Sequence, residues 1–452
     1  MSTITVTAPV EEKTALNELA LIGLGVLHLP LGVLMFQVPT VATAHAYGTL
    51  LFGLYVLVFK RSVRNVINVA AYAVGSEVLW RMTGAVVFYK AANYLVVILL
   101  MYALLSERSW KFDLLPVLYM LLLIPAILPT VVDFPWVEAR DYISHALGGP
   151  LSIAVCLLFF HNIRMRLRDL QRISFMIIMP AMAIGSVAMF TLLTAEEIRF
   201  TTESSIIGSG NFGPNQVSSI LGLAAALAIL HFLTHRSPTT RPFMGIVAAW
   251  LAFQTVLTYS RGGMVMGVMV AFMGMLFLMR EQQYRVEIST VLGLGALVIV
   301  AIIVPQVVRI SGVTLEDRFF EPEDSGITAF TSGRYDMARA DLFAWWQNPV
   351  FGTGVGGSAP YRARLYQSGH AHTEYTRMLA EHGLYGIGAL VIFIIAVARG
   401  LMQQRTSEQN AYVIPFVMWT LVYLLINATR MVAPAFLLGL GVASYFIGED
   451  EP

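Results

Sequence analysis

Fourteen apolar runs follow one another along this chain, and they decide what it can fold into. A helix needs roughly 20 apolar residues to cross a bilayer, and isolated strands in lipid would leave backbone polar groups unpaired. The sequence therefore predicts an all-α fold, a polytopic transmembrane helix bundle of about 12–14 spans. The runs cover residues 18–38, 41–59, 66–86, 91–105, 114–132, 147–161, 173–193, 214–234, 242–259, 262–280, 288–308, 383–398, 411–427 and 431–447.

The composition agrees with a membrane chain. Of the 452 residues, 57% are hydrophobic and 13% are charged, whereas soluble domains carry about 25% charged residues. The single cysteine, Cys156, excludes an intramolecular disulfide framework. The polar segment 1–13 lacks the pattern of a cleaved signal peptide, so we expect the first apolar run to stay in the mature protein.

Lysine and arginine gather in alternate short loops. By the positive-inside rule this side faces the cytoplasm, and both termini share it. The opposite short loops are poor in basic residues, and the one around 195–203 is acidic. The basic loops carry Lys60, Arg61, Arg64, Arg164, Arg166, Arg168, Arg172, Arg236, Arg241, Arg280, Arg285, Arg399 and Arg405.

One connection is much longer than the others. Residues 309–382 form a polar loop that the alternation places on the extracytoplasmic side, and such a loop is usually functional or folded. Within it, residues 333–347 predict an amphipathic helix that Thr331 or Ser332 caps and Asn348-Pro349 ends. We divide the one integrated membrane domain into helices 1–308, loop 309–382 and helices 383–452.

Two arginines on the extracytoplasmic side are candidate anion ligands. Arg261 lies between two apolar runs, where an arginine is costly unless it faces protein, water or an anion. Arg334 begins the predicted amphipathic helix, which also carries a further candidate, Arg339. The planar guanidinium matches phosphate oxygens, so two arginines converging from separate loops would suit a pyrophosphate. The alternatives are a snorkelling helix-end arginine and a solvated loop charge.

Histidines at the end of the long loop are candidate bases. His370 and His372 precede Glu374, and histidine can accept a proton from a hydroxyl nucleophile. The same residues with His382 could bind a metal, but a zinc site needs more ligands in defined geometry and no cysteine is available here. A structural histidine at the lipid interface is the remaining alternative. We expect no metal.

Two further features allow two interpretations each. Glu77 and Arg81 lie four residues apart inside an apolar run, either as functional intramembrane charges or as a structural ion pair. The glycine-rich stretch 352–357 resembles a phosphate-cradling loop, but it follows no soluble strand. For that stretch we expect a flexible turn beside a substrate.

The order of these motifs over about residues 210–390 resembles the O-antigen ligase and O-antigen polymerase superfamily of bacterial envelope glycosyltransferases. One departure is Thr373, where the family commonly has asparagine. The motifs, in order, are Gly213-Pro214-Asn215-Gln216, Ser260-Arg261-Gly262-Gly263, Ser332-Gly333-Arg334 with Trp345, Asn348-Pro349, Gly352, Gly354 and Gly356, and His372 with Tyr375, Leu379, Glu381, Gly383 and Leu384.

The resemblance implies a GT-C-like, metal-independent glycosyltransferase without cofactors in the bacterial inner membrane. Its donor would be an undecaprenyl-pyrophosphate-linked glycan on the periplasmic face. Arg261 and Arg334 match the arginines thought to hold the pyrophosphate, and His372 matches the histidine thought to activate or orient the acceptor hydroxyl.

The acceptor stays open. A polymerase would extend another lipid-linked repeat unit of O-antigen or exopolysaccharide, and a ligase would use a lipid A-core sugar in lipopolysaccharide biosynthesis; a protein acceptor is a further possibility. A lipid-linked glycan transporter or flippase is the alternative function, although the chain shows no two similar halves. A structural partner with a degenerate site is the third. The lipid bilayer is an expected partner, and nucleic acid is not.

Overall fold

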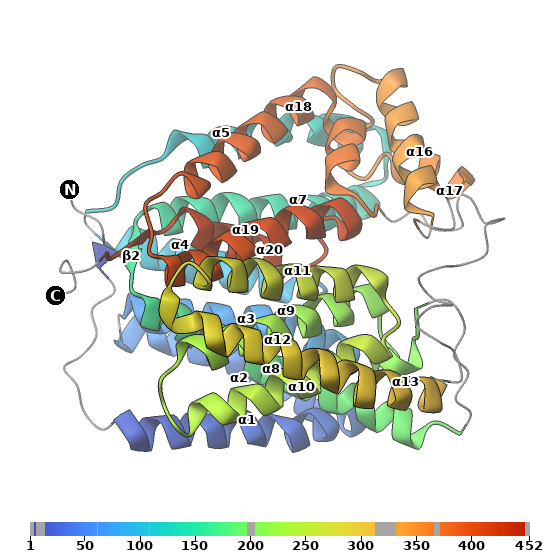
Figure 1. The fold of residues 1–452 in the computed structure, drawn as a ribbon. Coiled ribbons are helices and arrows are strands. Elements are labelled where there is room, and N and C mark those ends of the chain that lie inside the picture. The colour runs from blue at the N-terminus through green and yellow to red at the C-terminus, as the bar shows by residue number, and fades with distance from the viewer. Residues whose placement is uncertain are drawn as a thin grey trace.

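The computed structural model describes residues 4–5, 14–60, 62–107, 109–196, 204–311, 331, 333–365 and 371–447. Most of its helices lie side by side along one direction, whereas α16 runs across that direction, as Figure 1 shows. Both chain ends lie at one end of this bundle, at the left of Figure 1, and α16 (Arg334–Gln347) and α17 (Ala359–Leu365) lie at the other. We call these the terminal end and the loop end.

Each of the fourteen apolar runs forms helix. Within the described residues, ten helical stretches are long and apolar enough to cross a membrane, which confirms the predicted polytopic all-α bundle. Of the remaining helices from these runs, α3 and α10 are more polar, and α4 and α20 are short. The helices are α1 (Thr14–Gln37), α2 (Pro39–Tyr55), α3 (Val63–Met82), α4 (Ala91–Ser106), α5 (Leu114–Leu123), α6 (Ile127–Asp133), α7 (Trp136–His161), α8 (Leu167–Thr194), α9 (Pro214–Thr234), α10 (Thr240–Leu257), α11 (Arg261–Leu278), α12 (Gln282–Val298), α13 (Val304–Ser311), α18 (Glu374–Leu401), α19 (Ser407–Asn427) and α20 (Ala433–Val442).

Short strands tie the terminal end together. The sheet has the order β1 (Ile4–Thr5), β2 (Ile163–Met165) and β3 (Ser444–Tyr445), and both pairings are parallel. Because β2 lies in the basic loop between α7 and α8, both chain termini share an end with that loop. This is the arrangement that the alternation of basic loops predicts, and assigning the terminal end to the cytoplasm stays a prediction.

Small residues let α9 and α11 pack closely in the centre of the bundle. A Cβ added to Gly222 of α9 would lie 2.6 Å from the Gly263 carbonyl oxygen of α11. A Cβ on Gly263 would lie 2.2 Å from the Ser218 hydroxyl oxygen. Close approach through small residues is typical of helices in membranes. It places the first residue of α11, Arg261, directly beside the start of α9.

At the loop end, α16 forms where the amphipathic helix is predicted. The N-cap position of α16 is Gly333, without a side-chain capping bond, and the Thr331 hydroxyl, two residues earlier, accepts the Tyr335 backbone N–H at 3.2 Å. The helix ends before Asn348, which confirms Asn348-Pro349 as the stop. Ser332 lies outside the described residues.

The expectation of a flexible turn at 352–357 is wrong. Gly352, Gly354 and Gly356 have φ angles of 71°, 82° and 79°, a region that favours glycine. Each is packed: an added Cβ would lie 2.4 Å from the Glu381 carbonyl carbon, 2.8 Å from the Thr130 hydroxyl oxygen and 2.7 Å from the Tyr142 ring, respectively. The stretch is a tight connector between α16 and α17 that also contacts α6, α7 and α18.

Gly383 interrupts α18. Its φ and ψ angles of 57° and −133° are not helical, so residues before it form a short separate helix and residues after it form the membrane-length segment. The Leu384 N–H turns to the Pro349 carbonyl at 3.0 Å. The interruption lies at the position where the sequence separates the long loop from the C-terminal helices.

Candidate active site

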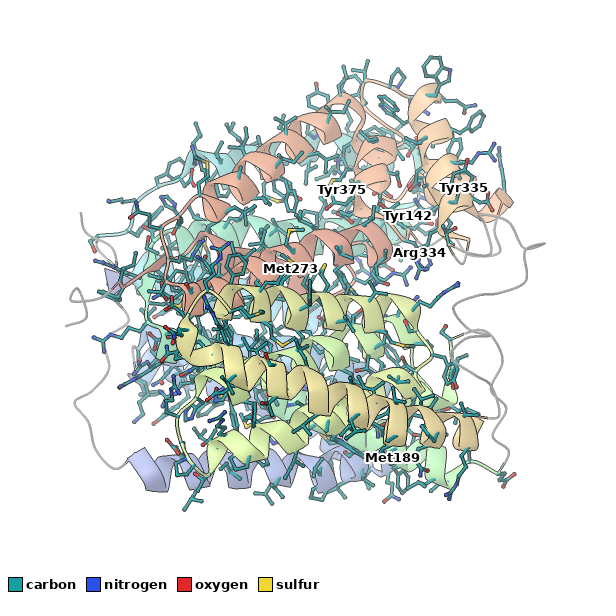
Figure 2. The ribbon with its side chains drawn as sticks, viewed as in Figure 1. Tyr142, Met189, Met273, Arg334, Tyr335 and Tyr375 are labelled. Atoms are coloured by element: carbon teal, nitrogen blue, oxygen red, sulfur yellow. The ribbon has the colours of Figure 1, made fainter. Side chains whose placement is uncertain are left out.

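Arg261 and Arg334 both lie beside the end of α19. The Arg334 guanidinium donates from Nε to the Ile426 carbonyl and from Nη1 to the Thr331 carbonyl, each at 3.1 Å. Next to Arg261, a Cβ added to Gly262 would lie 2.8 Å from Ile426 Cδ1. Figure 2 labels Arg334 at the start of α16, close to this point. The structure thus brings the two predicted anion ligands from separate segments to one place, which we call the junction.

Local packing explains why Arg261 stands there. The Ser260 hydroxyl donates to the Asn215 side-chain oxygen at the start of α9, at 3.0 Å. Tyr259, just before it, has a φ of 53°, which is costly for a residue other than glycine. The strained Tyr259 thus precedes the Ser-Arg-Gly-Gly motif, whose Ser260 is the N-cap of α11 and whose Arg261 is the first helical residue.

His372 precedes α18 and is half-buried. The carbonyl of the residue before it, Ala371, accepts from Arg430 Nη2 at 2.9 Å. Tyr375, in the first turn of α18, donates to the Leu421 carbonyl of α19 at 3.1 Å. Thr373, which replaces the family's asparagine, is buried at the N-cap position of α18 without a side-chain capping bond. The neighbours of His372 thus contact α19 and the loop that follows it.

The metal alternative invoked His370, His372, Glu374 and His382. His370 lies outside the described residues. The Glu374 carboxylate accepts from Arg377 and from the N–H and hydroxyl of Thr429. In residues 371–447 and the other described ranges, no three His, Cys, Asp or Glu side chains are grouped as metal ligands would be. Glu374 instead holds the segment that follows α19.

Glu77 and Arg81 pair, with 2.5 Å between Arg81 Nη2 and Glu77 Oε1. The other Glu77 oxygen accepts the Val432 N–H at 2.7 Å. Arg81 Nη1 donates to the Gln216 side chain at 2.8 Å and to the Arg430 carbonyl at 3.1 Å. These contacts favour the structural ion pair, because the pair links α3 to α9 and to the segment after α19.

A cavity of about 220 Å³ opens beside this ion pair. Its wall includes Trp80, Phe88 and Phe212, and Arg81 lies 3.8 Å from the centre of the Tyr89 ring. The cavity therefore combines aromatic faces with one charged pair.

Residues 428–432, between α19 and α20, form what we call the junction loop. Lys90 Nζ donates to the Thr429 carbonyl at 2.7 Å, and Glu374 accepts the Thr429 N–H at 3.1 Å. Burial lowers the pKa of the Lys90 amine from 10.5 to about 7. Glu77 and Glu374 oppose this decrease, whereas Arg81 and Arg377 add to it. Side chains from α3, from the turn before α4 and from α18 thus fix the junction loop.

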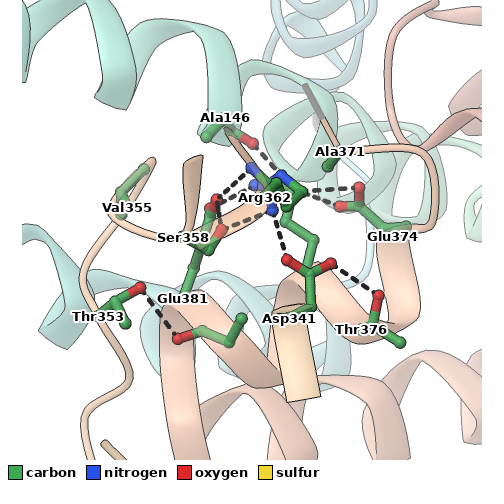
Figure 3. A network of polar contacts seen from close by, with 12 residues as sticks. Ala146, Asp341, Thr353, Val355, Ser358, Arg362, Ala371, Glu374, Thr376 and Glu381 are labelled. Carbon is green, nitrogen blue, oxygen red and sulfur yellow. Dashed lines mark hydrogen bonds and ion pairs between the residues drawn. The ribbon is translucent and has the colours of Figure 1, made fainter. Parts of the chain in front are cut away.

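A buried network of charges joins α16, α17 and α18, as Figure 3 shows. Arg362 pairs with Asp341 at 2.5 Å, and Arg377 pairs with Glu374 at 2.5 Å and with Glu381 at 2.8 Å. All five residues are 5% exposed or less. Burial raises the pKa of Asp341, and Arg362 opposes that increase. The network holds the helix that begins at Arg334 against the helix that follows His372.

Arg339 lies elsewhere on α16. Its side chain is exposed, and its guanidinium carbon is 5.8 Å from the centre of the Tyr335 ring. These contacts keep it on the outer face of the helix, so the structure does not group it with Arg261 and Arg334.

Arg430 and Lys90 escaped the sequence analysis. Both stand in short loops on the side where basic residues are scarce. That scarcity was a usable signal, because the positive-inside rule makes each such residue an exception that needs a reason.

Comparison with known families found a match. Residues 246–391 match the family model described as O-Antigen ligase. This segment of the chain is similar to the O-antigen ligase family, which supports the resemblance to the O-antigen ligase and polymerase superfamily. A search of curated proteins found no match. The O-antigen ligase segment contains Arg261, Arg334 and His372, whereas Arg81, Lys90 and Arg430 lie outside it.

Proposed function

We propose that the protein is a membrane glycosyltransferase that transfers a glycan from undecaprenyl pyrophosphate to an acceptor sugar hydroxyl. The reaction would take place on the periplasmic face of the inner membrane, with both termini in the cytoplasm. The observation that carries the proposal is that Arg261 and Arg334, both inside the O-antigen ligase segment, come from separate helices to the surroundings of Ile426 at the loop end.

The chemistry assigns a role to each group. The bond between the anomeric carbon and the pyrophosphate oxygen breaks, and a bond from the acceptor oxygen to that carbon forms. Arg261 and Arg334 stabilise the negative charge that grows on the leaving pyrophosphate. His372 accepts the proton of the acceptor hydroxyl. The proposal needs no cofactor and no metal.

Three alanine variants test this assignment. In liposomes that hold the lipid-linked donor, we expect Arg261→Ala, Arg334→Ala and His372→Ala each to lower product formation by about a hundredfold or more. Arg261→Lys and Arg334→Lys should also be impaired, because lysine cannot grip two oxygens with a planar fork. Activity at the wild-type level in all three alanine variants, with normal protein amounts, would end the mechanistic proposal.

Arg140→Ala is the matched control. Arg140 lies near the start of α7 at the loop end, and its exposed side chain pairs with the exposed Asp141 at 3.1 Å. The variant removes one arginine charge from the same end of the bundle without touching the junction. We expect it to retain wild-type activity.

The acceptor distinguishes the two forms of the enzyme. A ladder of products from lipid-linked repeat units alone would support a polymerase and exclude an obligate ligase. Product only when lipid A-core is supplied would support a ligase. Activity that survives EDTA is expected in either form.

A flippase remains the second candidate because a charged pair lies inside the bundle. The hydrogen bonds of this pair weigh against a flippase, since Glu77 accepts from Val432 and Arg81 donates to Gln216 and Arg430. Substrate uptake into vesicles without any change in glycan size would favour the flippase.

A further inference from the structure

The junction loop is held by more charged side chains than a five-residue connection needs. Glu77 accepts the Val432 N–H, Arg81 donates to the Arg430 carbonyl, and Lys90 donates to the Thr429 carbonyl. Glu374 binds both the N–H and the hydroxyl of Thr429.

The backbone of this loop is constrained as well as held. Ala428 has a φ of 51° and a ψ of −166°, a conformation that is costly for a residue other than glycine. On the other side, a Cβ added to Gly149 would lie 2.3 Å from Thr429 Cβ, so α7 leaves the loop no room to shift. The backbone of the junction loop is therefore fixed in position, and the Arg430 side chain projects from it.

The Arg430 guanidinium is half-buried and differs from its neighbours in what it contacts. Arg81 and Arg377 each pair with a carboxylate at 2.5 Å. Arg430 donates to the Ala371 carbonyl at 2.9 Å, and no carboxylate of the described residues forms an ion pair with it. A carbonyl orients a guanidinium but does not neutralise it, so among the described residues this partly buried positive charge has no counter-charge.

The surroundings of Arg430 favour an anion. Burial lowers the pKa of the Arg430 guanidinium, and Arg362 and Arg81 lower it further, whereas Tyr423 and Tyr89 act in the opposite direction. An anion bound here would offset the cost of burying the guanidinium charge, since opposite charges stabilise one another most in partly desolvated sites. One carbonyl contact also leaves most of the five guanidinium N–H groups available to a ligand.

We propose that Arg430 is a third anion-binding arginine, which grips the pyrophosphate of the lipid-linked donor together with Arg261 and Arg334. This inference rests on the proposed function. The Ile426 carbonyl, which accepts from Arg334, is four residues before Arg430, so the three arginines border the same end of α19. The Ala371 contact places Arg430 beside His372. There the guanidinium would stabilise the negative charge on the leaving group while the acceptor loses its proton.

The test measures binding of two lipids without a glycan to the full-length protein in nanodiscs. Undecaprenyl pyrophosphate and undecaprenyl monophosphate differ by one phosphate group, so the ratio of their affinities reports contacts to the pyrophosphate. We expect wild type to prefer the pyrophosphate and Arg430→Ala to lose about tenfold or more of that affinity, with a smaller loss for the monophosphate. Arg430→Lys should keep part of the preference, since it keeps the charge but not the fork.

Two further variants separate binding from structure. Arg430→Gln can still donate to the Ala371 carbonyl, so it should fold like wild type and bind the pyrophosphate as weakly as Arg430→Ala. Arg140→Ala removes an exposed arginine at the same end and should leave both affinities unchanged. Thermal unfolding of each variant checks that the fold is intact.

Each contrary outcome has a separate meaning. An unchanged pyrophosphate preference in Arg430→Gln would overturn the inference while leaving the proposed function in place. Weaker binding only of a donor with an acidic glycan would assign Arg430 to a sugar carboxylate and also overturn it. A wild-type protein that does not distinguish the two lipids would contradict both the inference and the proposed function.

Discussion

Arginines in two neighbouring regions of the loop end bind different partners. In the buried network, Arg362 and Arg377 pair with carboxylates at 2.5 Å. In the junction loop, Arg430 donates to a backbone carbonyl at 2.9 Å. Both regions are close to His372, so proximity to the candidate base does not explain the difference.

The difference separates arginines that stabilise the fold from an arginine that can bind a ligand. A buried arginine paired with a carboxylate has its charge neutralised, and removing one partner leaves the other buried alone. A carbonyl fixes the direction of a guanidinium and leaves its charge available to a ligand. We therefore expect changes in the network to act on stability and changes in the junction to act on substrate.

The largest effect is expected from Arg377→Met. This change leaves Glu374 and Glu381 buried without their common partner and removes the contact to the Ala146 carbonyl at 3.3 Å. Breaking a buried pair in this way costs about 3–5 kcal/mol. Thermal unfolding of the purified protein in detergent, together with its yield, measures the loss.

Arg430→Gln is the comparison for Arg377→Met. It removes a similar charge nearby but strands no carboxylate, so we expect its stability to stay within about 1 kcal/mol of wild type. Equal unfolding temperatures for the two variants would break the distinction between network and junction.

A smaller loss is expected from Gly356→Ala, which tests whether the tight connector supports the network. Gly356 has a φ of 79°, and an added Cβ would lie 2.7 Å from the Tyr142 ring. The left-handed conformation alone costs an alanine about 1–2 kcal/mol. Gly293→Ala in α12 is the control, because no atom lies within 4 Å of the new Cβ, and it should be neutral or slightly stabilising. Equal stability of the two variants would show that the connector at 352–357 accommodates the added methyl group without loss of stability.

Helix positions were predictable because they depend on local sequence. An apolar run of span length forms helix in lipid whatever its neighbours do. The stop at Asn348-Pro349 also follows from adjacent residues, and the structure has it. Arg261, Arg334 and His372 could be proposed from the sequence because each belongs to a short motif with a fixed order along the chain.

Contacts between distant segments were not predictable. Lys90 and Thr429 are 339 residues apart, and Arg81 and Gln216 are 135 apart, so no spacing rule relates them. Glycines at 352–357 were visible, but the surfaces that require them belong to α6, α7 and α18. Charges in the long loop could not be divided into paired and unpaired ones before the packing of α16, α17 and α18 was known.

The smallest effect concerns Lys90, which lies between the two classes. It is 3% exposed, as in the network, but its amine donates to a carbonyl, as in the junction. The pKa of this amine is lowered from 10.5 to about 7, with Glu77, Arg81, Glu374 and Arg377 as its charged neighbours. Between these values the unfolded chain binds a proton that the folded protein does not, so the stability of the folded protein rises with pH. We expect the free energy of unfolding to rise by about 1 kcal/mol between pH 7 and 8. Thermal unfolding in detergent at these pH values measures the rise.

Lys90→Met should remove that rise and leave a flatter pH profile, which makes the difference between the two proteins the quantity to measure. The penalty of burying the amine is fully present below about pH 7 and is relieved as pH increases toward 10.5. If wild type and Lys90→Met have the same slope, the lysine keeps its charge through Glu77 and Glu374 and belongs with the neutralised arginines of the network. If the slopes differ as expected, one carbonyl does not hold a buried charge unaided, and the charge on Arg430 would then require the bound anion that we propose.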